Sequence, residues 1–215
     1  MNHDPALPDA RKFLRDATHA DHVRLNHHSL LIGLTKPGYS LAMYPQVLLA
    51  QYYFYLTLEA AIEQFCAGRP LDFSYANRRK LPLLRDDLRD FGIDPETTAW
   101  QPQALRSPVR LDDLGQLIGV LYTIEGSSLG GQIVFRHLSA HAGLTASRGA
   151  RFFHGYGERT MACWLQFEDF MSAHLTQAQT RASALQSAKA AFALMHAILD
   201  ECLARHARSE GGVSA

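Results

Sequence analysis

Apolar residues recur at intervals of three and four positions along most of the chain, which is the periodicity of amphipathic α-helices. The first such segment, residues 10–28, follows Asp9, a residue type that caps helix N-termini, and a second helix is expected from Pro45 to about Cys66. No segment of useful length alternates polar and apolar residues, so the predicted fold class is all-α. The later helices are expected over residues 76–91, 111–141, 161–175 and a final stretch that includes 185–203.

The second predicted helix carries two polar groups on its apolar stripe. Tyr55 and Glu59 fall at helical spacing among Leu48, Ile62 and Cys66. A carboxylate in such a position is most often a polar contact between packed helices, and a tyrosine there is most often part of the core. We therefore expect Glu59 to be a packing contact rather than a catalytic acid.

Three glycines, Gly126, Gly130 and Gly131, interrupt the helix predicted over 111–141, in the stretch "LYTIEGSSLGGQ". Each costs about 1 kcal/mol relative to alanine in a helix interior, so the cluster needs an explanation. A phosphate-binding loop would need a lysine that is missing here, and a dinucleotide fingerprint would need a preceding strand. Two explanations remain: close approach of a second helix, or a large flat ligand lying against exposed backbone.

The composition is that of one globular domain. With 215 residues, 47% of them hydrophobic, the chain can bury one substantial core, and we assign residues 1–208 to a single domain and 209–215 to a flexible C-terminal tail. Lys and Arg number 21, as do Asp and Glu, so the formal net charge of +0 gives no reason to expect nucleic acid or a membrane as a partner. Three scattered cysteines and the lack of a secretory signal favour a cytoplasmic protein.

The chain has 11 histidines, and four of them gather in or near the first predicted helix. Their spacing excludes a zinc site of the H-E-x-x-H type, and there are no Glu-x-x-His pairs on two helices for a di-iron site. A single axial histidine that faces a glycine-rich helix is a different arrangement, and it is the one that a haem pocket requires. The four are His19, His22, His27 and His28.

Four segments, in order, resemble the haem oxygenase (heme oxygenase) family, and most of all its bacterial members that accompany bacteriophytochromes. The likeness spans nearly the whole chain. It implies a single-domain multihelical haem oxygenase-like fold with haem b as both cofactor and substrate, opened to biliverdin with release of carbon monoxide and ferrous iron. It also implies consumption of O2, electrons from ferredoxin or another donor, and a bacteriophytochrome as one acceptor of biliverdin. The segments are "LRDATHADHVRL", "YYFYLTLEAAIE", "LYTIEGSSLGGQ" and "FFHGYGERTMACW".

The resemblance also assigns site residues. His22 matches the proximal iron ligand, and Gly126 and Gly130 match the distal glycines that touch the haem face. Arg15 matches a basic residue that pairs with a haem propionate, where it would make a charge-assisted bond. Gly131, in the same distal segment, is included among the haem contacts.

The sequence departs from the animal family pattern at three places. Ser127 stands where a distal aspartate organises water, so any proton relay must run through water held by the hydroxyls of Ser127, Ser128 or Tyr55. Asn26 replaces a glutamate one turn after His22, which predicts less imidazolate character on the ligand and a higher iron potential.

The third departure lies on a late helix, where a basic pair that clamps the propionates is replaced by Leu165 and Asp169. Two alternative functions remain open. One is a non-catalytic haem-binding or haem-transfer protein on the same fold, which the missing distal aspartate would allow. The other is a helical enzyme that acts on another small molecule, such as a thiamin-degrading relative. That enzyme would need a nucleophilic cysteine beside its pocket, and none of the three cysteines has a visible base partner.

Overall fold

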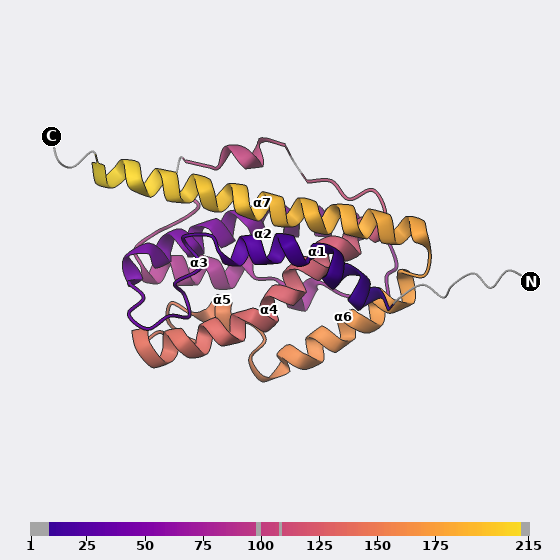
Figure 1. The fold of residues 1–215 in the computed structure, drawn as a ribbon, viewed down its shortest axis with the longest axis horizontal. Coiled ribbons are helices and arrows are strands. Elements are labelled where there is room, and N and C mark those ends of the chain that lie inside the picture. Colours follow the sequence, from indigo (N-terminus) through magenta and orange to yellow (C-terminus); the bar gives the residue numbers. More distant parts are fainter. Residues whose placement is uncertain (1–8, 98–99, 108, 212–215) are drawn as a thin grey trace, which may run out of the picture.

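The computed structural model describes residues 9–97, 100–107 and 109–211, with side chains described as far as residue 208 (Figure 1). In these residues the regular structure is helical and contains no β-strand, which confirms the all-α prediction. The α-helices are α1 (Ala10–Asn26), α2 (Tyr44–Cys66), α3 (Leu81–Asp90), α4 (Leu114–Ala142), α5 (Arg151–His154), α6 (Thr160–His174) and α7 (Ala178–Gly211). Short 3₁₀ turns are η1 (Leu41–Met43), η2 (Ala76–Arg78), η3 (Gln103–Arg106) and η4 (Gly157–Arg159).

Helix ends follow local capping chemistry where it is strong. The Asp9 side chain accepts a hydrogen bond from the Lys12 amide at 2.8 Å, so α1 begins at the predicted residue. Asp113 caps α4 in the same way, through the Gln116 amide at 2.8 Å, and this helix therefore begins three residues later than predicted. α7 continues to Gly211, and residues 212–215 of the predicted tail lie outside the described part of the chain.

The third helix differs from the prediction at its start. The periodic pattern indicated residues 76–91, but 76–78 form the 3₁₀ turn η2 and α3 begins at Leu81, with Pro82 in its first turn. The Lys80 amide donates to the buried Glu59 carboxylate of α2 at 2.5 Å instead of joining a helix. The tertiary contact thus overrides the local helical pattern, and it also confirms Glu59 as a packing contact between elements.

α7 is the longest helix of the described residues, and three of the other helices pack on it. It contacts α4 most extensively and also contacts α1 and α2, while α6 packs against α4 on the side away from α7 (Figure 1). The core lies among these helices and is built largely from the apolar and aromatic residues of α2. Among the described residues no helix combines the length and apolarity needed to cross a membrane.

Two glycines allow α4 and α7 to approach closely. A Cβ atom added at Gly119 would lie 2.0 Å from the carbonyl oxygen of Ala184 and 2.1 Å from Ser187 Oγ. One added at Gly115 would lie 2.4 Å from the carbonyl oxygen of Thr180. Close helix packing, one of the two explanations for the glycine cluster, therefore occurs in α4 about two to three turns before that cluster.

Candidate active site

α1 and α4 meet at one point and then diverge. Tyr122 of α4 shares a side-chain hydrogen bond with Thr18 of α1, and from there α4 runs down and away from α1 (Figure 1). They are linked again through the segment after α1, where His137 Nε2 lies 2.9 Å from the carbonyl oxygen of Lys36. Fifteen residues separate Tyr122 from His137, which is about 22 Å along a helix. Between these two links nothing lies within 4 Å of the position of a Cβ at Gly130, and we call the space in front of this part of α4 the opening.

The part of α4 that lines this opening is bare backbone. Gly126 and Gly130 follow Tyr122 at steps of four residues, so they lie on the same side of the helix. Nothing lies within 4 Å of the position of a Cβ at Gly130, and a Cβ at Gly126 would meet only the Trp164 ring, at 3.8 Å. Ile133, on the same side, is 56% exposed. We call Gly126, Gly130 and Ile133 the open stripe.

Gly131 and Ser128, two of the predicted haem contacts, lie off the open stripe. A Cβ at the buried Gly131 would lie 3.3 Å from the carbonyl oxygen of Phe153 in α5, so this glycine serves helix packing. The Ser128 hydroxyl donates to the carbonyl of Ile124, at 3.4 Å, within its own helix. The reason is geometric, because each residue turns the helix by about 100° and carries these two positions away from Gly126.

Ser127 and Tyr55, by contrast, are brought together. The Tyr55 hydroxyl lies 3.2 Å from Ser127 Oγ, which itself donates to the carbonyl of Ile124 at 2.8 Å. Tyr55 is buried, and burial raises its pKa above the usual tyrosine range, so the phenol keeps its proton at neutral pH. Ser127 is exposed beside the open stripe. The pair places hydroxyl groups next to Gly126, where they can bind water.

His22 lies one turn beyond Thr18 on α1. The side-chain amide nitrogen of Asn26 is 3.3 Å from His22 Nδ1, and the Phe192 ring of α7 packs edge-on with a centroid separation of 6.2 Å. Partial burial lowers the pKa of His22, and the neighbouring His19 lowers it further. At neutral pH the imidazole therefore keeps a free lone pair, which is the form that ligates metals.

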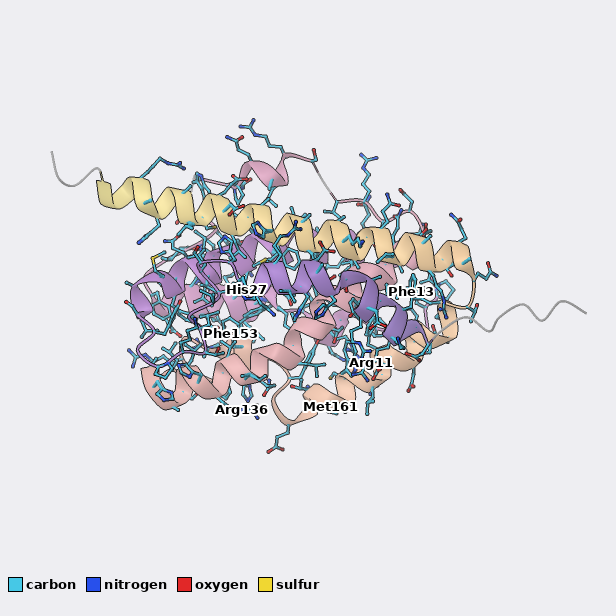
Figure 2. The ribbon with its side chains drawn as sticks, viewed as in Figure 1. Arg11, Phe13, His27, Arg136, Phe153 and Met161 are labelled. Carbon is cyan, nitrogen blue, oxygen red and sulfur yellow. The ribbon has the colours of Figure 1, made fainter. Side chains whose placement is uncertain are left out.

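The basic residues of α1 differ in what they contact. Arg15 is exposed and lies 3.2 Å from Asp16 of the same helix. Arg11, one turn earlier, reaches α6 (Figure 2), where it pairs with Glu168 at 3.0 Å and lies 5.7 Å from the centre of the Trp164 ring. Arg11 was not among the predicted site residues, although its four-residue spacing from Arg15 places both on one side of α1.

The face of α6 that carries a basic pair in the family pattern carries Leu165 and Asp169 in this chain. Leu165 is 51% exposed, and Met161, one turn earlier, is 57% exposed. Asp169, the second replacement, is also exposed. Among the described residues, α6 therefore presents apolar surface where the family pattern has positive charge, as Figure 2 shows for Met161.

The other three histidines of the group in or near α1 lie on a different side of that helix from His22. Asp200 of α7 accepts from His28 Nε2 at 3.1 Å and from His196 Nδ1 at 3.0 Å. These residues, with His19 and His27, line an open groove of about 720 Å³ between the end of α1 and α7. The open stripe does not contribute to this groove, and no group of three or more potential ligands in the described residues is arranged to hold a metal ion.

Two of the three cysteines are poor nucleophiles. Burial raises the pKa of Cys202 to about 12 and also raises the pKa of Cys66, so both thiols stay protonated at neutral pH. This argues against a thiol-dependent enzyme that uses Cys66 or Cys202.

Behind α4 lies a buried cation, Lys80, whose Nζ is 3.2 Å from the centre of the Tyr156 ring. Burial lowers the pKa of Lys80 to about 8, although the nearby Glu125 carboxylate acts in the opposite direction. Between this pKa and the ordinary value of 10.5, the unfolded chain binds a proton that the folded chain does not bind. Lys80 therefore makes the free energy of unfolding rise with pH across this window.

We predict that Lys80→Met removes this rise. Between pH 7.5 and 9.5 the unfolding free energy of the wild type should increase, relative to that of the variant, by about 2 kcal/mol. Urea unfolding of both proteins at several pH values measures this difference. The comparison cancels the contribution of Cys202, whose raised pKa makes the unfolding free energy fall as the pH rises. Parallel pH curves for the two proteins would contradict the prediction.

The chain is similar to known proteins over most of its length. The protein-family model described as heme oxygenase matches residues 9–201. A curated protein named heme oxygenase, from Xanthomonas campestris pv. campestris (strain 8004), is 35% identical over 131 residues, which cover 61% of this chain and 71% of that protein.

Solved structures share the fold. The NO- and CO-bound heme oxygenase of Neisseria meningitidis has a TM-score of 0.71 at 22% identity, covering 91% of this chain and 92% of that chain. Heme oxygenase-1 of the cyanobacterium Synechocystis, solved in complex with heme, has a TM-score of 0.74 at 17% identity, covering 95% of this chain and 97% of that chain. At these identities the structural likeness establishes the arrangement of helices.

Proposed function

This chain belongs to the haem oxygenase family, and on that premise we propose that it opens haem b to biliverdin, with release of carbon monoxide and ferrous iron, using O2 and an external electron donor. The observation that carries the proposal is the opening between α1 and α4. The neutral imidazole of His22 on α1 and the open stripe on α4 are the two groups that we propose as its walls. A flat macrocycle with an axial histidine is the ligand that these two walls suit.

The residues present fit haem. Nothing fills the space in front of Gly130, and the exposed Ile133 and Leu165 supply apolar surface for a porphyrin. When bound, haem supplies the iron and the reactive porphyrin edge, and O2 supplies the oxygen. His22 would ligate the iron, and the glycine backbone would restrict the space around the bound haem. Arg15, freed from Asp16, is the proposed partner of one propionate.

Proton supply is proposed to run through hydroxyls rather than a carboxylate. Tyr55 keeps its proton and donates to Ser127, which leaves Ser127 free to hold water beside Gly126. The Gly126 and Gly130 backbone limits how such water and O2 are placed, which gives the choice of ring carbon a steric origin. In this proposal His22, Gly126, Gly130 and Ser127 are the central site residues.

Asn26 provides a separate prediction about the iron. Asn26→Glu would put a carboxylate 4 residues after His22, where it accepts the second imidazole N–H and stabilises the ferric state. We expect a lower reduction potential in the haem-loaded variant, by an energy of about 1 kcal/mol, the usual difference between charged and neutral hydrogen bonds. Spectroelectrochemical titration measures it, with Asn26→Gln as the uncharged control. A potential that stays the same or rises would contradict the prediction.

Turnover with haem tests the proposed function. The purified protein is mixed with hemin in air and supplied with ascorbate, or with ferredoxin and its reductase. A Soret band that gives way to biliverdin absorbance supports the proposal. A stable Soret band would instead favour the haem-binding or haem-transfer alternative, and the lack of any Soret change would exclude both.

The partners belong to the same proposal. Ferredoxin or a similar one-electron donor is the proposed reductant, in the cytoplasm, and a bacteriophytochrome is the proposed acceptor of biliverdin. The support is the likeness of four sequence segments to the family members that accompany bacteriophytochromes. Supplying the turnover product to an apo-bacteriophytochrome tests the acceptor, because only the correct biliverdin isomer should generate its far-red absorbance.

A further inference from the structure

One buried guanidinium joins three elements directly behind the open stripe. Arg78, in η2, places Nη1 2.8 Å from Glu125 Oε2 of α4 and 3.1 Å from the carbonyl oxygen of Cys163 in α6. Its Nη2 donates to Gln166 Oε1 of α6 at 3.1 Å. The guanidinium also lies over the Phe73 ring, 4.5 Å from its centre. Arg78 is buried, so water does not compete for these contacts.

The two anchor points of Arg78 adjoin the point where the open stripe meets α6. Glu125 directly precedes Gly126, and Cys163 directly precedes Trp164. A Cβ at Gly126 would lie 3.8 Å from the Trp164 ring. The planar guanidinium of Arg78 thus bridges α4 and α6. On each helix it binds the residue just before the contact between Gly126 and Trp164, and so it fixes the separation of the two helices there.

The Glu125 carboxylate is held from both sides. Its Oε2 accepts from Arg78, and its Oε1 accepts from the Tyr156 hydroxyl at 3.0 Å. Tyr156 is fixed in turn by Lys80, which lies over its ring. Any rotation of α4 at this position would break one of two buried contacts. The glycines that follow provide no side chains to stiffen the helix, so this restraint acts where α4 has least rigidity of its own.

We propose that Arg78 is a positioning residue that sets the placement of Gly126 over the haem face and so determines which ring carbon is oxidised. This rests on the proposed haem oxygenase function. Arg78 is buried behind α4, and it acts through Glu125 and Cys163 on the backbone of the open stripe. We call the contacts of Arg78 with Glu125 and Cys163 the clamp. Without the clamp the open stripe shifts relative to α6, and more than one ring carbon of haem is then oxidised.

The test replaces the ion pair by apolar residues of similar length. In Arg78→Met/Glu125→Leu neither partner is left as a lone buried charge, a change that folded proteins often tolerate. In the haem-free protein we expect amide hydrogen exchange over residues 126–130 to become about tenfold faster. With hemin and a reductant, we expect chromatography to show a mixture of biliverdin isomers where the wild type gives one.

Arg79→Met is the matched control. Arg79 is the next residue and is also a paired arginine, but it contacts Glu59 and Glu63 of α2 and reaches neither α4 nor α6. Exchange over residues 126–130 and the isomer composition should stay as in the wild type. If Arg79→Met reproduces the changes of the double variant, the effect is one of general stability and the proposal is overturned.

A second variant covers the case in which the double variant does not fold. Arg78→Lys keeps the charge but lacks the fork needed to hold α4 and α6 together, so the same two changes are expected. Unchanged exchange over residues 126–130 together with a single isomer would overturn the proposal. A wild type that forms no biliverdin would refute the proposed function instead, and the exchange experiment on haem-free protein would still decide whether the clamp exists.

Discussion

Replacing His22 by alanine is expected to remove the protein's ligand to haem iron and to weaken haem binding by at least about 100-fold, because even the hydrogen-bonding partners of metal ligands are worth about 10–100-fold in affinity. His22 offers a neutral nitrogen because partial burial holds its pKa below the usual value. Asn26 and Phe192 contact its ring and orient it. Titration of the haem-free variant with hemin, followed at the Soret band, measures both effects.

His27→Ala is the control for this experiment. His27 lies at the end of α1, and its Nδ1 is 2.8 Å from the carbonyl oxygen of Val23, so it serves as a local cap of the helix. Its loss should leave the spectrum of bound haem unchanged. Added imidazole should restore axial ligation in His22→Ala by occupying the vacated space. A His22→Ala protein with the wild-type Soret band would show that another histidine is the ligand.

The position of α1 and of His22 on it could be predicted because the information is local. Asp9 caps the helix, the apolar periodicity continues to Asn26, and His22 follows Thr18 on one side of the helix. The contact between Thr18 and Tyr122 had no such signal, because about 100 residues separate them and only the packed fold brings them together. The opening that these two residues bound was therefore outside the reach of sequence patterns.

The glycines of α4 show where spacing alone is ambiguous. Gly115 and Gly119 are four residues apart, as are Gly126 and Gly130, so both pairs are compatible with close helix packing. The structure separates them, since the first pair meets the α7 backbone and the second faces open space. The packing of Gly131 could not be predicted, because it depends on α5, a four-residue helix that follows no predicted pattern.

The clamp behind the open stripe had no sequence signal either. Arg78 lies in a short 3₁₀ turn within a segment predicted to be helical, and 47 residues separate it from Glu125. Nothing in the local pattern distinguishes it from the exposed Arg79 beside it. An ion pair between distant segments can be identified only when the fold and the burial of its residues are known. Because Arg78 and Glu125 are buried, their pair restrains the position of α4.

Replacing Gly130 by alanine is expected to have opposite effects on stability and on catalysis. The added methyl group meets no atom within 4 Å, so the haem-free protein should gain about 0.5–1 kcal/mol in unfolding free energy from the better helix former. In the haem-loaded enzyme the same group occupies the space between the helix and the ligand. A displacement of about 1 Å at a reacting centre costs on the order of 10²-fold in rate, and we expect biliverdin formation to slow by that amount.

Gly131→Ala places the same methyl group one residue along, 3.3 Å from the Phe153 carbonyl oxygen and away from the opening. It should give no gain in stability and leave haem turnover unchanged. Urea unfolding of both haem-free variants and single-turnover kinetics with hemin complete the comparison. A Gly130→Ala enzyme that keeps the wild-type rate would show that the open stripe does not contact haem. A rise in stability together with a loss of turnover would show that Gly130 is retained for the ligand, because packing alone would favour alanine at this position.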